Sequence, residues 1–214
     1  MGQPFGTIFG TSYARNDNGT IIYDSQGRPV EGEQKVLGEG VPPWTIGFTN
    51  SFRYKNFDLS FLIDAKFGGQ VYAGTNSLAL RNGLDRRTLV GRNGDLTVTG
   101  VDEAGNPFSF THDDTTLQGY YTRLAEIAEE VVEDADFVKL RQLSFGYSFP
   151  RSLLEKTFIK EAKVSFVGRN LFFIQRNSEN IDPEAGFNAG NAQGLEFFGL
   201  PATRSLGFSA NVKF

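Results

Sequence analysis

The sequence of 214 residues contains no cysteine and only one histidine, which excludes a disulfide framework and a thiolate metal site. It also lacks any run of about 18 consecutive apolar residues, so no transmembrane helix is predicted. The formal charge of −4 provides no basic footprint, and nucleic acid is therefore not an expected partner. The opening residues 1–4 have neither a charged n-region nor an apolar h-region, so a signal peptide is expected to be absent.

Residues suited to catalysis or metal binding do not occur in a suitable arrangement. His112 stands beside Asp113 and Asp114 without a nucleophile elbow, and we expect it to be a solvated loop residue rather than a catalytic base. The six carboxylates between residues 126 and 136 lack the ligand spacing and central glycine of a calcium loop, so a solvated helix face is expected. We therefore predict no catalytic residue, no metal and no cofactor, and the chain is not expected to be an enzyme.

The abundant residues are phenylalanine and glycine, with 21 and 25 copies. The hydrophobic share of 39% and the mean hydropathy of −0.29 are nonetheless those of a soluble protein. Transmembrane β-barrels combine both properties, because they distribute apolar residues singly along alternating strands.

The strictest alternation runs through residues 204–214. One face of an extended strand would hold Leu206, Phe208, Ala210, Val212 and Phe214, and the other Ser205, Gly207, Ser209, Asn211 and Lys213. This period of two predicts a strand with one face in an apolar medium and one in a wet medium. The segment resembles the closing strand of outer-membrane barrels, which implies that Phe208, Ala210, Val212 and Phe214 act as a barrel-assembly signal. From this segment alone, an edge strand of a soluble sandwich is the alternative.

Residues 44–54 and 57–67 show the same alternation on either side of Lys55-Asn56, which predicts a hairpin with a two-residue turn. Strands of this length, tilted as in a barrel, span about 27 Å, close to the roughly 25 Å apolar band of such barrels. The aromatic ends, with Trp44 at one rim and Tyr54 and Phe57 at the other, fit interfacial girdles.

Three further strands are predicted at residues 4–14, 137–149 and 162–173. In the second, Val138 and Leu140 are out of phase with the residues that follow, which indicates a bulge near Arg141. The prediction is thus an all-β antiparallel barrel segment of about six strands.

Three long segments, 15–43, 68–136 and 175–203, lack strand periodicity and are predicted to be loops. The first is expected to contain a small hairpin around residues 20–23, and the second one short helix at 118–132. Because short turns of such barrels face the periplasm and long loops face outward, Phe214 is expected on the periplasmic side.

Several short motifs occur in order along almost the whole chain. They are Gly2-Gln-Pro-Phe-Gly-Thr7, Pro43-Trp-Thr-Ile-Gly-Phe-Thr-Asn-Ser51, Tyr54-Lys-Asn-Phe-Asp-Leu-Ser60, Asp136-Phe-Val-Lys-Leu-Arg-Gln-Leu-Ser-Phe-Gly-Tyr-Ser-Phe-Pro150, Gly168-Arg-Asn-Leu171, Asp182-Pro-Glu184 and Pro201-Ala-Thr-Arg204. In these motifs the chain resembles the C-terminal part of a TonB-dependent outer-membrane receptor of the SusC/RagA type. The positions that carry the resemblance are Lys139, Leu140, Arg141, Tyr147, Pro150, Arg169, Asn170, Leu171, Asp182, Pro183, Glu184 and Arg204.

The resemblance implies a 22-stranded barrel in the outer membrane of a Gram-negative bacterium, importing oligosaccharides or peptides with energy from TonB. It further implies a SusD-like surface lipoprotein as partner, and outer-membrane lipid around the barrel. Residues 1–214 would form the C-terminal barrel part, without the plug domain, the TonB box and the signal peptide. The TonB complex would then be reached through the missing N-terminal region.

Three alternatives stay open at this point. A soluble carbohydrate-binding β-domain would use exposed aromatic residues as sugar platforms. A TonB-dependent receptor could serve another nutrient, such as a siderophore. An outer-membrane enzyme would need a nucleophile facing a base, and the single His112 in a loop argues against it.

Overall fold

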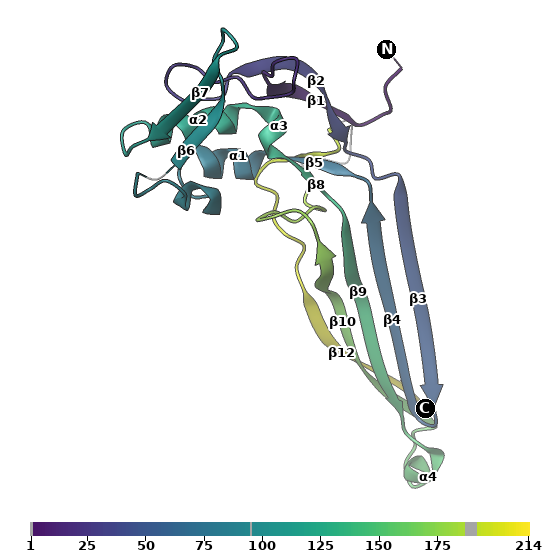
Figure 1. Ribbon diagram of the computed structural model, residues 1–214. Coiled ribbons are helices and arrows are strands. Elements are labelled where there is room, and N and C mark those ends of the chain that lie inside the picture. Colours follow the sequence, from purple (N-terminus) through teal and green to yellow (C-terminus); the bar gives the residue numbers. More distant parts are fainter. Residues whose placement is uncertain (1, 95, 187–191) are drawn as a thin grey trace. The chain divides into compact units, whose positions relative to one another are not determined.

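The computed structural model describes residues 2–94, 96–186 and 192–214, with the elements labelled in Figure 1. The chain divides into two compact units, each built from segments that are distant in the sequence. The sheet unit comprises Pro42–Gly68, Ala135–Asn177 and Pro201–Phe214. The mixed unit comprises Met1–Val41, Gly69–Asp134 and Ser178–Leu200.

The sheet unit is one antiparallel sheet of five strands in the order β12-β10-β9-β4-β3. Its strands are β3 (Trp44–Tyr54), β4 (Phe57–Phe67), β9 (Phe137–Ser148), β10 (Glu161–Arg176) and β12 (Ser205–Lys213). Strands β3 and β12 form the two edges of this sheet. Four of the five were predicted with ends that differ by one residue at most, whereas β10 is longer at both ends than the predicted 162–173.

The predicted hairpin is confirmed. Strands β3 and β4 pair from Trp44↔Phe67 to Tyr54↔Phe57 without a register shift. The two-residue turn requires an unusual backbone, since Lys55 has a positive φ of 52°.

The bulge predicted near Arg141 is also confirmed. Strand β4 pairs Leu62 with Gln142 and Ile63 with Leu140, so Arg141 is the extra residue. On the other side of β9, strand β10 breaks its register between Arg169 and Phe172. Both irregularities therefore fall at the same level of the sheet.

The connections of the sheet alternate between its two ends. Residues 55–56 and 149–160, the latter with the short helix α4 (Arg151–Leu154), join strands at one end. Residues 68–136 and 177–204 leave from the opposite end. This grouping of short and long connections follows from the antiparallel order, and it is the grouping that the sequence predicts.

The prediction that the long segments are structureless loops was wrong, because the mixed unit is built from short strands and helices. Its strands are β1 (Thr7–Tyr13), β2 (Glu31–Glu39), β5 (Gln70–Ala73), β6 (Leu96–Val101), β7 (Pro107–His112), β8 (Val132–Asp134) and β11 (Leu195–Glu196). They form a β1-β2 pair, a β6-β7 pair and a three-stranded sheet β11-β5-β8. Strand β1 was expected to be a sixth barrel strand, but it pairs with β2 and not with the five-stranded sheet. The expected hairpin at 20–23 is reduced to single bridges.

The helices of this unit are α1 (Gly74–Arg81), the 3-10 helix η1 (Arg86–Leu89), α2 (Leu117–Glu126) and α3 (Ala128–Val131), where one helix was expected. The predicted helix 118–132 breaks at Ile127, whose backbone is extended. There the Thr11 hydroxyl accepts a hydrogen bond from the Ala128 amide at 3.0 Å and supplies the partner that an unbroken helix would provide. The predicted buried face is confirmed at Tyr121, Leu124 and Val131, which pack with Leu80, Leu117 and Ala125.

Within the described residues, no helix combines the length and the apolar composition needed to cross a membrane.

Candidate functional site

The five-stranded sheet separates apolar from polar side chains across its whole width. Registered neighbours on one face are apolar, as in Phe61↔Leu143, Phe166↔Phe145 and Phe166↔Phe208. Exposed members of this apolar face are Trp44, Ile46, Phe48, Phe52, Tyr54, Phe57, Phe145, Val164, Phe172, Leu206, Phe208 and Val212. A continuous apolar surface of this extent is rare on soluble monomers and indicates contact with a membrane or another protein.

Aromatic contacts connect this apolar face from strand to strand. The Phe57 ring lies 5.7 Å from Phe145 and 4.9 Å from Tyr147. The Phe166 ring lies 5.7 Å from that of Phe208, which is 82% exposed. These rings fix the relative register of neighbouring strands but leave their outer surfaces free for an apolar medium.

The opposite face carries partnered charges and small polar residues. The Lys163 ammonium lies 2.6 Å from the Asp58 carboxylate, and Asp64 pairs with Arg141. Lys139 is only 2% exposed, and its ammonium lies 4.4 Å from the centre of the Phe173 ring. These five charged side chains are thus held in place by neighbours rather than free in solution.

The two bulges bring together residues from separate sequence motifs. Arg141 donates to the Asp64 carboxylate and, at 3.1 Å, to the Asn170 side-chain oxygen. Asn170 has a positive φ of 49°, and its side-chain Nδ2 donates to the Thr203 carbonyl at 3.3 Å. This bulge cluster, comprising Asp64, Arg141, Asn170 and Thr203, ties β4, β9 and β10 to the segment that leads into β12.

The other residues that carry the family resemblance occupy structural positions. Leu140 and Tyr147 belong to the apolar face of β9, Pro150 is the N-cap of α4, Arg169 pairs with Ser205, and Arg204 is exposed just before β12. Leu171 is buried and folds over Gly168, where a Cβ would lie 2.7 Å from it.

The Asp182-Pro183-Glu184 motif lies in the mixed unit and forms a turn. The buried Asp182 side chain accepts from the Glu184 amide at 3.0 Å, and the Asp182 carbonyl accepts from the Ala185 amide at 2.9 Å. Pro183 and Glu184 therefore occupy a local turn that is closed by Asp182.

The residues interpreted as an assembly signal lie where the alternation places them. Phe208, Ala210 and Val212 pair with Phe166, Val164 and Ala162 of β10. The Phe214 ring stacks on Phe158 at 5.5 Å.

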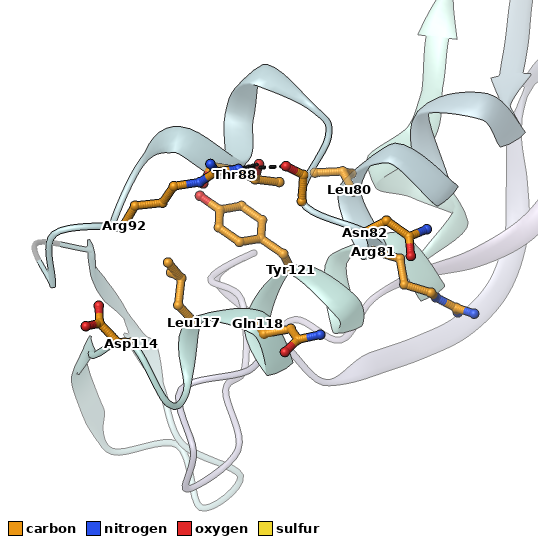
Figure 2. A pocket seen from close by; sticks show the side chains of 10 residues that line it. Leu80, Arg81, Asn82, Thr88, Arg92, Asp114, Leu117, Gln118 and Tyr121 are labelled. Atoms are coloured by element: carbon orange, nitrogen blue, oxygen red, sulfur yellow. Dashed lines mark hydrogen bonds between the residues drawn. The ribbon is translucent and has the colours of Figure 1, made fainter.

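A pocket of about 360 Å³ opens in the mixed unit between α1, η1 and α2 (Figure 2). The Tyr121 ring lies at its centre, held by a hydrogen bond of 2.7 Å from its hydroxyl to the Arg87 carbonyl. Arg92 is fixed beside it, because its guanidinium donates to the Thr88 and Gly83 carbonyls at 2.8 and 2.6 Å. The remaining lining residues are Leu80, Arg81, Asn82, Asp114, Leu117 and Gln118. A mostly apolar lining with a few fixed polar groups is typical of small-molecule sites.

The carboxylates after residue 126 do not form the solvated helix face that was expected. Glu129 accepts from Arg15 at 2.7 Å and from Lys35 at 3.0 Å, and Glu130 accepts from the Tyr13 hydroxyl at 2.5 Å. The Arg15 hydrogen bond, together with those of Lys35 and the Tyr13 amide, lowers the pKa of Glu129 to about 2. These acids fasten α3 to β1 and β2, so their role is structural.

His112 is likewise not the solvated loop residue that was expected. It is fully buried at the end of β7, and one ring nitrogen lies 3.1 Å from the Gly27 carbonyl. Burial lowers the pKa of this imidazole. Its ring packs against Phe110 and Tyr120, which makes it a core residue.

Two features of the site were missed. Asp64, the partner of Arg141, belongs to an ordinary alternating strand and carries no signal of its own. The pocket collects residues from three elements that share no motif. The phase shift in β9 was the one signal that pointed toward the bulge cluster.

The comparisons with known proteins point to one class of receptor. No protein-family model matches the chain. The chain is 30% identical over 197 residues to the TonB-dependent receptor P3 of Formosa agariphila, covering 89% of the chain and 18% of that protein. It is 21% identical over 178 residues to the TonB-dependent receptor SusC of Bacteroides thetaiotaomicron, covering 76% of the chain and 16% of that protein.

Solved structures share the fold. Chains of the RagAB peptide importer in its "closed-closed" and "open-open" states superpose with TM-scores of 0.61, at 18% and 19% identity, over 95% of this chain and 22% of theirs. The chain thus spans about a fifth of the length of the relatives that it matches. With these relatives and this fold, the chain belongs to the TonB-dependent receptors of the SusC/RagA type.

Proposed function

We propose that this chain is the C-terminal part of the barrel of an outer-membrane importer, and that its five-stranded sheet is one stretch of the barrel wall. The observation that carries the proposal is the sheet with one exposed aromatic face and one face of partnered charges. Strands of such barrels alternate between lipid-facing apolar residues and lumen-facing polar ones. A soluble carbohydrate-binding domain would have to leave the whole aromatic face in water.

The two edges of the sheet, β3 and β12, then pair with further strands of the same barrel, which is 22-stranded in the full receptor. An unpaired edge in lipid is too costly, because its backbone groups find no hydrogen-bond partner there. The short connections at 55–56 and 149–160 face the periplasm, as does Phe214, and the long connections face outward. The bulge cluster fixes the curvature of the wall, and Phe208, Ala210, Val212 and Phe214 act in assembly.

The cargo is a glycan or a peptide, taken up with energy from the TonB complex through regions outside this chain. A SusD-like surface lipoprotein is the expected partner on the side of the long connections. The relatives support this reading, since one is the receptor SusC and the structural neighbours are chains of a peptide importer. The pocket around Tyr121 is a candidate contact for such a cargo, and Gln118→Ala, at its rim, should weaken uptake without unfolding the unit.

The wall assignment is tested by lipid contact in the full-length receptor. A fluorophore on a cysteine placed at Phe208 should be quenched strongly by brominated phospholipid in reconstituted vesicles. The matched cysteine at Ser209, one residue along the same strand, should be quenched by aqueous iodide and not by lipid. Equal lipid quenching at both positions would refute the assignment.

A further inference from the structure

The connection between β9 and β10 has a composition unlike the rest of the chain. Residues 150–160 contain three cations, Arg151, Lys156 and Lys160, against the single acid Glu155. The chain as a whole carries a formal charge of −4. Apolar residues are interleaved with these cations, as in segments that lie on anionic membrane surfaces.

The apolar residues of this connection are turned outward. Leu153 is 63% exposed and Phe158 is 79% exposed. Because these side chains are exposed, they are available to an apolar layer outside the chain.

The connection leans toward the apolar face of the sheet. Phe158 stacks on Phe214, which continues the apolar series of β12, with ring centres 5.5 Å apart and planes 15° apart. The Lys160 ammonium donates to the Phe214 carbonyl oxygen at 3.1 Å and secures this contact. The same medium that meets the apolar face therefore also reaches Phe158.

Two cations of the same turn are free to reach a headgroup layer beside it. Among the described residues, no ion pair holds Arg151 or Lys156, and both are exposed. At the neighbouring turn, the Lys55 ammonium lies 5.3 Å from the centre of the Tyr54 ring, whose residue is 71% exposed. Tyrosine rings and snorkelling lysine side chains are both common at membrane interfaces.

We propose that the turn 150–160 is an anchor for anionic phospholipid headgroups at the short-turn end of the barrel. Phe158 and Leu153 would enter the interfacial layer, while Arg151 and Lys156 bind the phosphates of lipids such as phosphatidylglycerol. This inference rests on the proposed lipid-facing role of the sheet, to which it adds a lipid selectivity.

The test uses the full-length receptor with a fluorophore on Ser152→Cys, in vesicles of phosphatidylcholine and phosphatidylglycerol. Brominated phosphatidylglycerol should quench this label more than brominated phosphatidylcholine, and a cation near a membrane surface contributes about fivefold to such a preference. The R151Q/K156Q variant should therefore lose up to about 30-fold of the preference at low salt. The charge-matched control R86Q/R176Q should retain it.

Equal quenching by the two lipids, or a preference that survives R151Q/K156Q, would overturn the anchor. The Phe208 label separates this failure from the failure of the wall assignment. Lipid quenching at 208 without lipid selectivity at 152 would remove the anchor alone, whereas no quenching at 208 by either lipid would remove the wall.

Discussion

Replacing Phe208 with arginine tests most directly which face of the sheet meets lipid. Phe208 is the fourth of the nine residues of β12, so it lies near the middle of the apolar band. The change removes the ring contact with Phe166, worth about 0.5–1.5 kcal/mol. In the proposed barrel wall it also places a cation in lipid, at about 2–4 kcal/mol near the midplane. Together these predict that Phe208→Arg lowers the stability of the folded barrel by about 3–5 kcal/mol.

Ser209→Arg is the matched control on the adjacent residue. Ser209 pairs with Ser165 on the polar face and is exposed, so in the proposed barrel wall the longer side chain reaches water in the lumen. We expect a change below about 0.5 kcal/mol, as for an ordinary surface substitution. The assay is the outer-membrane level and heat-modifiability of both variants in the full-length receptor. If Ser209→Arg proves as damaging as Phe208→Arg, the faces are assigned wrongly and a soluble β-domain becomes the better account.

Three other perturbations test separate parts of the structure. Asp64→Asn should destabilise the sheet by about 1–3 kcal/mol in urea unfolding, because it leaves the guanidinium of Arg141 without its carboxylate. The control Lys213→Gln, in an exposed ion pair, should change the stability little. Equal effects of the two changes would contradict a stabilising role of the bulge cluster. Lys55→Gly should stabilise the hairpin by about 1 kcal/mol, since Lys55 has a positive φ, and a loss of stability would mean that its ammonium matters more than its backbone. Glu129 has a folded pKa of about 2 against 4.5 in the unfolded chain, so its contribution is complete above about pH 4.5 and is lost as the pH falls toward 2. Hydrogen exchange at α3 and β1 should rise in that window, and constant protection down to pH 2 would show that the acid network is not stabilising.

The strands of the sheet can be predicted from the sequence because each is long enough to show the alternation of apolar and polar residues. Residues 44–67 alternate over two spans of eleven residues, which leaves little freedom in register or in the turn. The slip of phase at Arg141 is visible for the same reason. Alternation does not name the partner strand, however, so β1 was assigned to the wrong sheet.

Several strands of the mixed unit could not be predicted because they are too short to show such an alternation. Its strands β5, β8 and β11 have only four, three and two residues, too few for a period to register. The pairing that stabilises them joins Tyr72 to Leu195, far apart in the chain. His112 was misjudged on the same grounds, because its acceptor at Gly27 belongs to a distant segment.

The pairing of β5 with β8 has a consequence for how such a receptor can be altered. The chain leaves the sheet beside Lys66↔Phe137 and returns there, and Gln70↔Asp134 joins the two ends of the intervening segment. Gly68 also donates to the Asp136 carboxylate at 2.5 Å. The two ends of the segment 69–135 therefore lie next to each other and are joined by backbone pairing. Loop closure alone would therefore permit another folded segment with equally close ends in place of residues 69–135, but β1, β2 and β11 would then lose the partners that they have in α3 and β5. The five-stranded sheet would keep its own order of strands.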